Sequence, residues 1–333
     1  AGTGRGRPGG PGHVQAGDGL LRLYVSLTDA TDNRRIWTEK FDIPYPARNF
    51  LETQEAVSAK IVGALVDSFG IIARLLMQEV SYLDLNKANS YETSLLYYIW
   101  ESTQDKGNYI RAIQGIERSL ATDPYNQSLL AGLSRLYSAD HHYAFNRIPE
   151  NLNKSMDLAK MATGIDDGAP LGRLAMAHSL FVQGRKQALD ETLKILLSMD
   201  LTPYALSVVG FFTGLAFDLE EGMALQGKAA GLNPRQPGYH QIVPFLHHYS
   251  RGDFESAMKH TLLLNMPTNV WDPILRSITY HKLNQPYAVQ NAVEHIFVLE
   301  PDFKNKREQL LRAMLFDGRW MSLVSEGLWE VGL

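Results

Sequence analysis

The sequence predicts a mainly α-helical protein, in which stacked helical hairpins form a superhelix behind a small, incomplete α/β element. Three segments end in Asp123-Pro124, Asn233-Pro234 and Glu300-Pro301, each after a stretch with helical apolar spacing. Pro234 and Pro301 are 67 residues apart, which is close to two units of a two-helix repeat of about 34 residues. No strand pattern is evident after Tyr82, so repeated helix pairs are expected from there to the end.

Small and apolar residues recur at fixed offsets before these prolines. Two helices that pack closely need a small residue at their point of contact. A small residue that recurs at the same position relative to each proline therefore indicates a recurring helical hairpin. The slots before Pro124 hold Ala112, Ile116 and Ser119, and those before Pro234 hold Gly222, Gln226 and Ala229.

Composition limits the classes of function. The 333 residues are 45% hydrophobic, as in globular proteins, and the net charge of −4 offers no basic field for nucleic acid. Cysteine is absent, which excludes disulfides and thiolate metal sites. With neither a signal peptide nor an apolar run long enough to cross a bilayer, we expect no membrane span in this chain. A cytoplasmic location is favoured, and a periplasmic one would require an anchor that precedes the chain.

The amino-terminal part divides into two segments. Residues 1–19 are rich in glycine and are expected to be disordered. Residues 20–80 are expected to form the α/β element, because alternating apolar residues predict strands over 21–27 and 35–41 and helical spacing begins at Phe50.

The remainder is predicted to be helical throughout. Turn signals such as Gly252-Asp253 separate about six hairpins within residues 81–302. Residues 303–333, rich in leucine and with Trp320, are expected to form capping helices.

The hairpins resemble tetratricopeptide repeats. Relative to the terminal prolines, the positions that the repeat consensus fills with large, Leu, Gly and Tyr residues hold Leu130, Leu133, Ser134 and Tyr137 in one unit, and Leu206, Val209, Gly210 and Thr213 in another. The resemblance implies an interaction array that binds a protein or peptide, not an enzyme.

The amino-terminal element resembles the last hairpin and helix of a TolB-like amino-terminal domain. The resemblance is carried by residues 23–30 (LYVSLTDA), residues 36–42 (IWTEKFD), and Phe50 and Gln54. Residues 325–333 (SEGLWEVGL) are similar to the ends of such chains. Bacterial winged-helix regulators and class III adenylate or guanylate cyclases carry this domain before tetratricopeptide arrays. The resemblance therefore implies a non-catalytic interaction and sensory region of a bacterial signalling or transcriptional regulator; an associated cyclase domain outside this chain is possible.

The predicted binding site is the concave groove of the array. Family geometry turns certain positions of each first helix towards that groove, and aromatic residues recur there; Arg135 could bind a carboxylate. The alternative is that the same side chains only pack one hairpin against the next. The groove residues are Tyr204, Phe211, Tyr239, Ile242, Leu246, Tyr249, Tyr280 and Arg135.

A second hypothesis is a small-molecule sensor with a pocket between the α/β element and the first repeats, near Trp37, Tyr97, Tyr98 and Trp100. No catalytic residue, cofactor or metal site is predicted: the pairs at 141–142 and 247–248 point adjacent imidazoles in different directions on a helix. A homodimer is left open.

Overall fold

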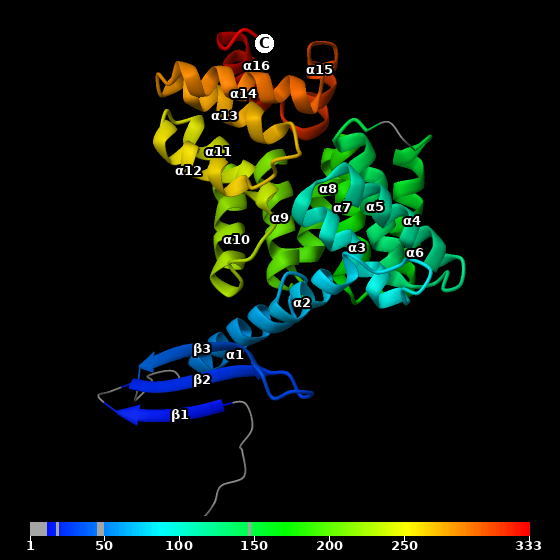
Figure 1. Cartoon of the computed structure of the whole chain (residues 1–333), viewed down its shortest axis with the longest axis vertical. Coiled ribbons are helices and arrows are strands. Elements are labelled where there is room, and N and C mark those ends of the chain that lie inside the picture. The colour runs from blue at the N-terminus through cyan, green and yellow to red at the C-terminus, as the bar shows by residue number, and fades with distance from the viewer. Residues whose placement is uncertain (1–11, 18–19, 45–49, 146–147) are drawn as a thin grey trace, which may run out of the picture.

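The computed structural model describes residues 12–17, 20–44, 50–145 and 148–333 of the chain. A small antiparallel sheet lies at one end, helix α1 runs alongside it, and a larger stack of paired helices follows (Figure 1). This is a mainly α-helical superhelix behind a small α/β element, so the predicted fold class is confirmed.

The sheet has the strand order β1-β2-β3, with both pairs antiparallel. The hairpin of β2 (Leu20–Thr28) and β3 (Arg35–Pro44) lies where the alternating pattern predicted it. Asn33 takes the left-handed conformation in its turn, with a φ of 57°. Asparagine tolerates this region better than most residues, which explains the choice of residue in the turn.

Strand β1 (Gly12–Gly17) corrects one prediction. The expectation that residues 1–19 are disordered is wrong for these six residues, which pair with β2 along their whole length. The pairing uses main-chain groups, which every residue carries, so a strand can form without an apolar side-chain pattern. Residues 1–11 and 18–19 lie outside the described residues.

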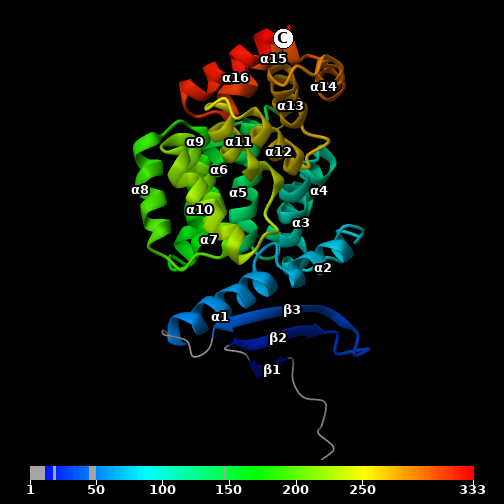
Figure 2. The same ribbon diagram turned by 90° about the vertical axis from the view of Figure 1, so that its left-hand side faces the viewer.

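Two helices connect the sheet to the stack, α1 (Phe50–Val66) and α2 (Ile71–Val80). They are separated at Gly70, where an added Cβ would lie 2.7 Å from the carbonyl oxygen of Leu65, so a larger residue does not fit. In both views α1 lies between the sheet and the stack (Figure 2).

The stretch Leu51–Val80 is apolar and long enough to cross a membrane by length and composition, and 22% of its most apolar window is buried. It is the one such helical stretch in the part of the chain that the structure describes. This differs from the expectation that the chain holds no apolar run of that length. Asp67, within this stretch, is 2% exposed and bonds to the helical stack, as described below.

Helix pairs follow one another through the stack, and a short 3-10 helix, η1 (Gly238–Gln241), leads into the fifth of them. In the described residues there are six pairs, namely α3 (Ser90–Thr103) with α4 (Lys106–Leu120), α5 (Gln127–His142) with α6 (Asn151–Ile165), α7 (Pro170–Val182) with α8 (Lys186–Leu197), α9 (Pro203–Ala216) with α10 (Leu219–Leu232), α11 (Ile242–Tyr249) with α12 (Phe254–Leu264), and α13 (Trp271–Lys282) with α14 (Pro286–Leu299). Helices α15 (Phe303–Met314) and α16 (Gly318–Glu330) end the chain.

The ends of these helices follow from local sequence. Pro124, Pro234 and Pro301 lie just beyond α4, α10 and α14, because proline cannot continue a helix. At the start of α3, Asn89 and Glu92 form a reciprocal capping box.

The recurring small residues mark the points where paired helices touch. A Cβ on Gly222 of α10 would lie 2.5 Å from the carbonyl oxygen of Gly210 and from the backbone of Gly214, both on α9. The corresponding Ala112 and Ala257 are completely buried. Backbone contact between the helices of a pair therefore explains the slot that the repeat pattern requires.

Candidate functional site

The structure places seven of the eight predicted groove side chains in the interior of the stack, with exposed fractions of 7% or less. Tyr280 on α13 is the exception and is half-buried. The inner surface of the superhelix is therefore filled by the chain's own side chains. The seven buried residues are Arg135 on α5, Tyr204 and Phe211 on α9, Tyr239 on η1, and Ile242, Leu246 and Tyr249 on α11.

A buried ion pair lies on this inner surface. Arg135 Nη2 donates to Glu101 Oε1 at 3.0 Å, and the two side chains are only 6% and 2% exposed. Arg135 Nη1 donates to the hydroxyl of Tyr204, which lies 3.2 Å from the hydroxyl of Tyr97. The Tyr239 hydroxyl donates to the same carboxylate oxygen at 2.5 Å. Helices α3, α5 and α9 and the η1 turn are thus joined by one hydrogen-bond network.

The aromatic rings of this network lie against the charged guanidinium, and the charges and burial in turn shift the pKa values of its members. The Arg135 guanidinium lies 5.2 Å from the ring centre of Tyr97 and 5.6 Å from that of Tyr204, within cation–π range. Burial is the largest single effect and disfavours the charge on Arg135, but the Glu101 carboxylate and the tyrosines at 204, 239 and 98 together outweigh it, so the pKa of Arg135 is raised. Burial also raises the pKa of Tyr204 and Tyr239, which keeps their hydroxyls protonated.

Buried histidines form two further contacts in the interior. His142 Nδ1 lies 3.1 Å from His178 Nε2, and His240 Nδ1 lies 2.6 Å from Ser207 Oγ. Burial lowers the pKa of His142 and of His240 to about 3, and it lowers that of His178 well below its ordinary value. These imidazoles are therefore neutral at pH 7.

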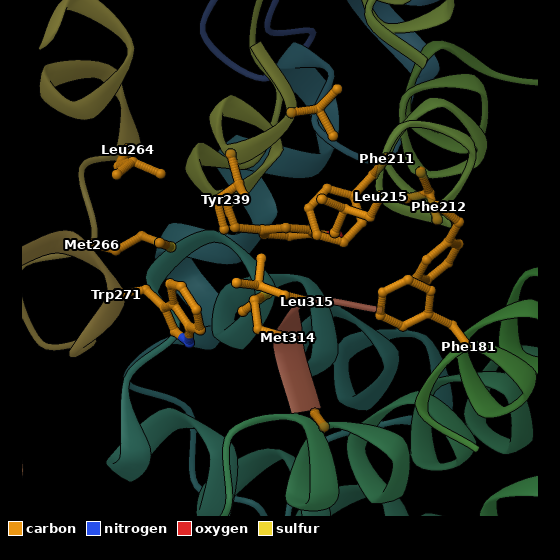
Figure 3. Packing of buried hydrophobic residues seen from close by; sticks show 14 of the residues in the cluster. Phe181, Phe211, Phe212, Leu215, Tyr239, Leu264, Met266, Trp271, Met314 and Leu315 are labelled. Atoms are coloured by element: carbon orange, nitrogen blue, oxygen red, sulfur yellow. The ribbon is translucent and has the colours of Figure 1, made fainter. Parts of the chain in front are cut away.

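The end of α15 closes the concave side. In Figure 3, Met314 and Leu315 lie between the side chains of Trp271 and Phe181. Met314 is completely buried, and its sulfur lies 3.0 Å from His142 Nε2 on α5. Helix α15 thus touches α5 of the second helix pair across the inside of the stack.

A small internal cavity borders the ion pair. Five of its lining side chains each carry a buried polar atom without a hydrogen-bond partner among the described residues. Its volume of about 10 Å³ is enough for roughly one water molecule. Because the five atoms include donors and acceptors, an ordered water with several partners fits this cavity. The atoms are Trp100 Nε1, Glu101 Oε2, Gln104 Oε1, Arg135 Nε and His178 Nδ1.

The structure does not bring together the four residues of the alternative pocket. Tyr97 and Trp100 line the internal cavity, whereas Tyr98 packs edge-on against Tyr204 with ring centres 5.6 Å apart. Trp37 on β3 lines a separate cleft of about 350 Å³ at the junction of the sheet, the α1–α2 pair and the segment after α10. That segment follows the fourth helix pair, not the first.

The junction beside this cleft is held by a buried carboxylate. Asp67 Oδ1 accepts a hydrogen bond from the Tyr204 main-chain N–H at 3.0 Å, and Asp67 Oδ2 accepts one from Asn233 Nδ2 at 2.7 Å. Asp67 and Asn233 are each 2% exposed. The α1–α2 joint is therefore fixed to both helices of the fourth pair.

Tyr280 lines an open groove of about 400 Å³ between α13 and α14. Asp272 and Arg276, which form an ion pair one turn apart, and His295 share this groove. It combines the aromatic side chain of Tyr280 with the partly exposed Arg276 and His295, whereas Asp272 is buried.

The charged and polar residues of the interior escaped the sequence-based prediction. Glu101 follows the apolar run at residues 95–100, and Asp67 interrupts the apolar residues of the α1–α2 segment. A single carboxylate within an apolar helix requires a buried partner. The isolated positions of Glu101 and Asp67 in apolar stretches could therefore have identified them as buried polar sites. Within the described ranges, no group of three or more histidine, aspartate or glutamate side chains is arranged to hold a metal ion.

These features define a helical-repeat protein with a closed interior and an α/β element fixed to its side. No protein-family model matches the chain, and no curated protein is significantly similar to it. Among solved structures, the crystal structure of the APC/C hetero-tetramer Cut9-Hcn1 is similar, with a TM-score of 0.49 and 14% sequence identity. The similarity covers 86% of this chain and 60% of that one, so this chain spans less than two thirds of that chain's length.

Proposed function

We propose that this chain is a non-catalytic protein-interaction and sensory region of a bacterial signalling or transcriptional regulator. The observation that carries the proposal is a stack of six helix pairs, joined internally by the network around Glu101 and Arg135. Stacked repeats present extended surfaces, and a partner that binds a rigid surface loses little affinity to ordering of the protein.

The α/β element supports the regulatory context. The β2–β3 hairpin followed by α1 has the order of elements that the TolB-like resemblance implies. In that context the chain receives a signal, and an output domain elsewhere acts on it.

The proposed contact surface for a protein or peptide is the groove that carries Tyr280. Tyrosine combines an apolar ring with a polar tip and is frequent among residues that dominate binding energy. Beside it, the partly exposed Arg276 and His295 offer polar groups to a peptide, while the buried Asp272 holds Arg276 in place. The seven buried groove residues contribute indirectly, because they fix the helices that support α13.

Site-specific photo-crosslinking tests this surface. A photoreactive phenylalanine at position 280 is expected to crosslink a partner in cells, and Tyr280→Ala is expected to reduce its recovery about tenfold, as for an interface residue worth more than about 1 kcal/mol. Tyr287 on α14 is the matched control, since its side chain is 84% exposed and does not line the groove.

Two results would count against the groove. One is equal crosslinking at positions 280 and 287, which indicates non-specific contact. The other is full partner recovery by Tyr280→Ala, measured with a variant whose thermal midpoint matches that of the unmodified chain.

A small-molecule sensor is the second candidate function. The observation that favours it is the 350 Å³ cleft at Trp37, whose walls come from both the α/β element and the helical stack. A ligand there would contact both parts at once, and binding to the folded state alone would raise the thermal midpoint.

A further inference from the structure

The cleft at Trp37 has the composition of a small-molecule site. Its volume of about 350 Å³ lies within the range of roughly 300–1,000 Å³ that ligand pockets occupy. Six of the eleven lining residues are apolar, and the other five are Glu39, Arg74, Gln78, Asn233 and Arg235, so the cleft combines an apolar wall with polar groups as ligand pockets do. Its two arginines outnumber the single carboxylate of Glu39. The apolar residues are Ile36, Trp37, Ala64, Ile71, Leu75 and Pro234.

Two arginines enter this cleft without anionic partners. In the described parts of the chain, neither Arg74 nor Arg235 forms an ion pair with a carboxylate. Arg74 Nε is buried and has no hydrogen-bond partner among the residues that the structure describes. Both arginines line the same cleft, and burial, followed by the positive charge of Arg235, lowers the pKa of Arg74. An anion between them would offset both positive charges.

The wall that carries Arg235 is fixed in place. Asn233, held by Asp67, accepts a hydrogen bond from the Arg235 main-chain N–H at 3.0 Å. Gln236 Nε2 donates to the Asn233 carbonyl oxygen at 3.0 Å. The loop after α10 is therefore ordered before any ligand arrives, which reduces the entropy cost of binding.

We propose that this cleft binds a small organic anion, with its phosphate or carboxylate head at Arg74 and Arg235 and a flat apolar body against Trp37. Arginine forks suit both kinds of oxyanion, and a planar body can stack on the indole ring. The inference rests on the sensor candidate and gives it a ligand class. Because Trp37 belongs to the sheet and Arg235 to the helical stack, the bound anion ties the two parts together.

Calorimetric titration of the full chain with phenyl phosphate tests the proposal. Phenyl phosphate is expected to bind saturably, to raise the thermal midpoint, and to bind more weakly as salt is added. Arg235→Met is expected to weaken binding about tenfold or more, the effect of losing a charge-assisted contact. Because Arg235 is exposed, this variant leaves the fold intact.

Two further variants distinguish the contribution of the ligand's anionic group from that of its aromatic ring. Arg312→Met, which removes an exposed arginine of α15, is expected to leave binding unchanged. Trp37→Leu is expected to weaken phenyl phosphate more than inorganic phosphate, because only the former has a ring to stack.

The outcomes distinguish the ligand class from the sensor function. Tighter binding of phenyl phosphate than of benzoate supports a phosphate ester, and the reverse supports a carboxylate. If phenol binds as tightly as phenyl phosphate and benzoate, the ligand need not be an anion; the proposed ligand class would then be refuted, while the sensor function would stand. No saturable binding by any of these probes, or binding that Arg235→Met does not change, would overturn the proposal, whereas crosslinking at position 280 would be unaffected.

Discussion

Asp67 and Asn233 share a hydrogen bond of 2.7 Å although 166 residues separate them in the sequence. Asn233 belongs to an Asx-Pro stop that ends a helix pair, and Asp67 lies in the break between α1 and α2. A repeat-ending residue thus has a second role, as the point where the α/β element is attached to the helical stack.

An exchange of the two side chains tests this attachment. Asp67→Asn presents an amide to the amide of Asn233, and we expect it to lower the free energy of unfolding by about 1–3 kcal/mol, as for a buried group that loses its partner. Asn233→Asp brings two carboxylates together and is expected to cost more. The double variant Asp67→Asn/Asn233→Asp should recover part of the loss, as measured by urea unfolding.

The control for this exchange is Asp84→Asn, since Asp84 only caps an exposed local turn through Asn86. Its expected effect is within about 0.5 kcal/mol. Additive losses in the double variant would show that Asp67 and Asn233 do not interact in solution.

Removing one partner of the buried Glu101–Arg135 ion pair is expected to lower the free energy of unfolding more than the exchange at Asp67 and Asn233. Arg135→Met leaves a buried carboxylate without its cation, and we expect a destabilisation of about 3–5 kcal/mol. Arg135→Lys is expected to recover only part of this, because an ammonium cannot donate to Glu101 and Tyr204 in the planar geometry of the guanidinium. Chemical denaturation measures both. A value for Arg135→Met no larger than that of Arg312→Met, an exposed control expected to cost under about 1 kcal/mol, would refute the role of the pair.

The internal cavity predicts a buried water. A high-resolution crystal structure is expected to show one ordered water within hydrogen-bond distance of at least two of Trp100 Nε1, Glu101 Oε2 and Arg135 Nε. Trp100→Phe is expected to lower stability by about 1–3 kcal/mol, because it removes a donor that the water uses. An empty cavity together with a neutral Trp100→Phe variant would show that these atoms remain unpaired.

The buried histidines predict a loss of stability in mild acid. In the folded state the pKa of His142 and His240 is about 3, whereas in the unfolded chain it is near 6.5. Between these values the unfolded chain binds more protons, so the free energy of unfolding falls as the pH falls from about 6.5, by up to about 1.4 kcal/mol per histidine and pH unit.

Unfolding measured from pH 7.5 to 5 checks this window, where few carboxylates titrate. His240→Gln should flatten the slope, and His281→Gln, at a side chain that is 43% exposed, should not. Stability that stays constant or rises on acidification would contradict the buried neutral imidazoles.

The local elements of the fold could be predicted because their causes are local. Alternating residues gave the β2–β3 hairpin, the prolines marked helix ends, and small residues such as Gly222 marked helix contacts. Strand β1 could not be predicted, because its pairing depends on main-chain groups that carry no sequence signal.

The buried network and the cleft could not be predicted, because their residues come from several repeats and no single repeat shows how they meet. The position of Tyr204 on an inner face follows from the repeat register, but its burial follows from the curvature that accumulates over successive pairs. Glu101 meets Tyr239 across 138 residues, and no local pattern states that distance. Arg74 on α2 and Arg235 in the loop after α10 likewise come from segments far apart in the sequence.

The contact between Met314 and His142 has a consequence for how the molecule comes apart. In an open solenoid each repeat touches only its neighbours, so the stack can fray from either end while its middle persists. Here residues 172 positions apart are in contact, and helix α15 rests on α5 of the second pair. Because α15 is held by α5, it cannot detach without breaking contacts to the second pair, and we therefore expect the repeats between them to unfold together as one cooperative unit.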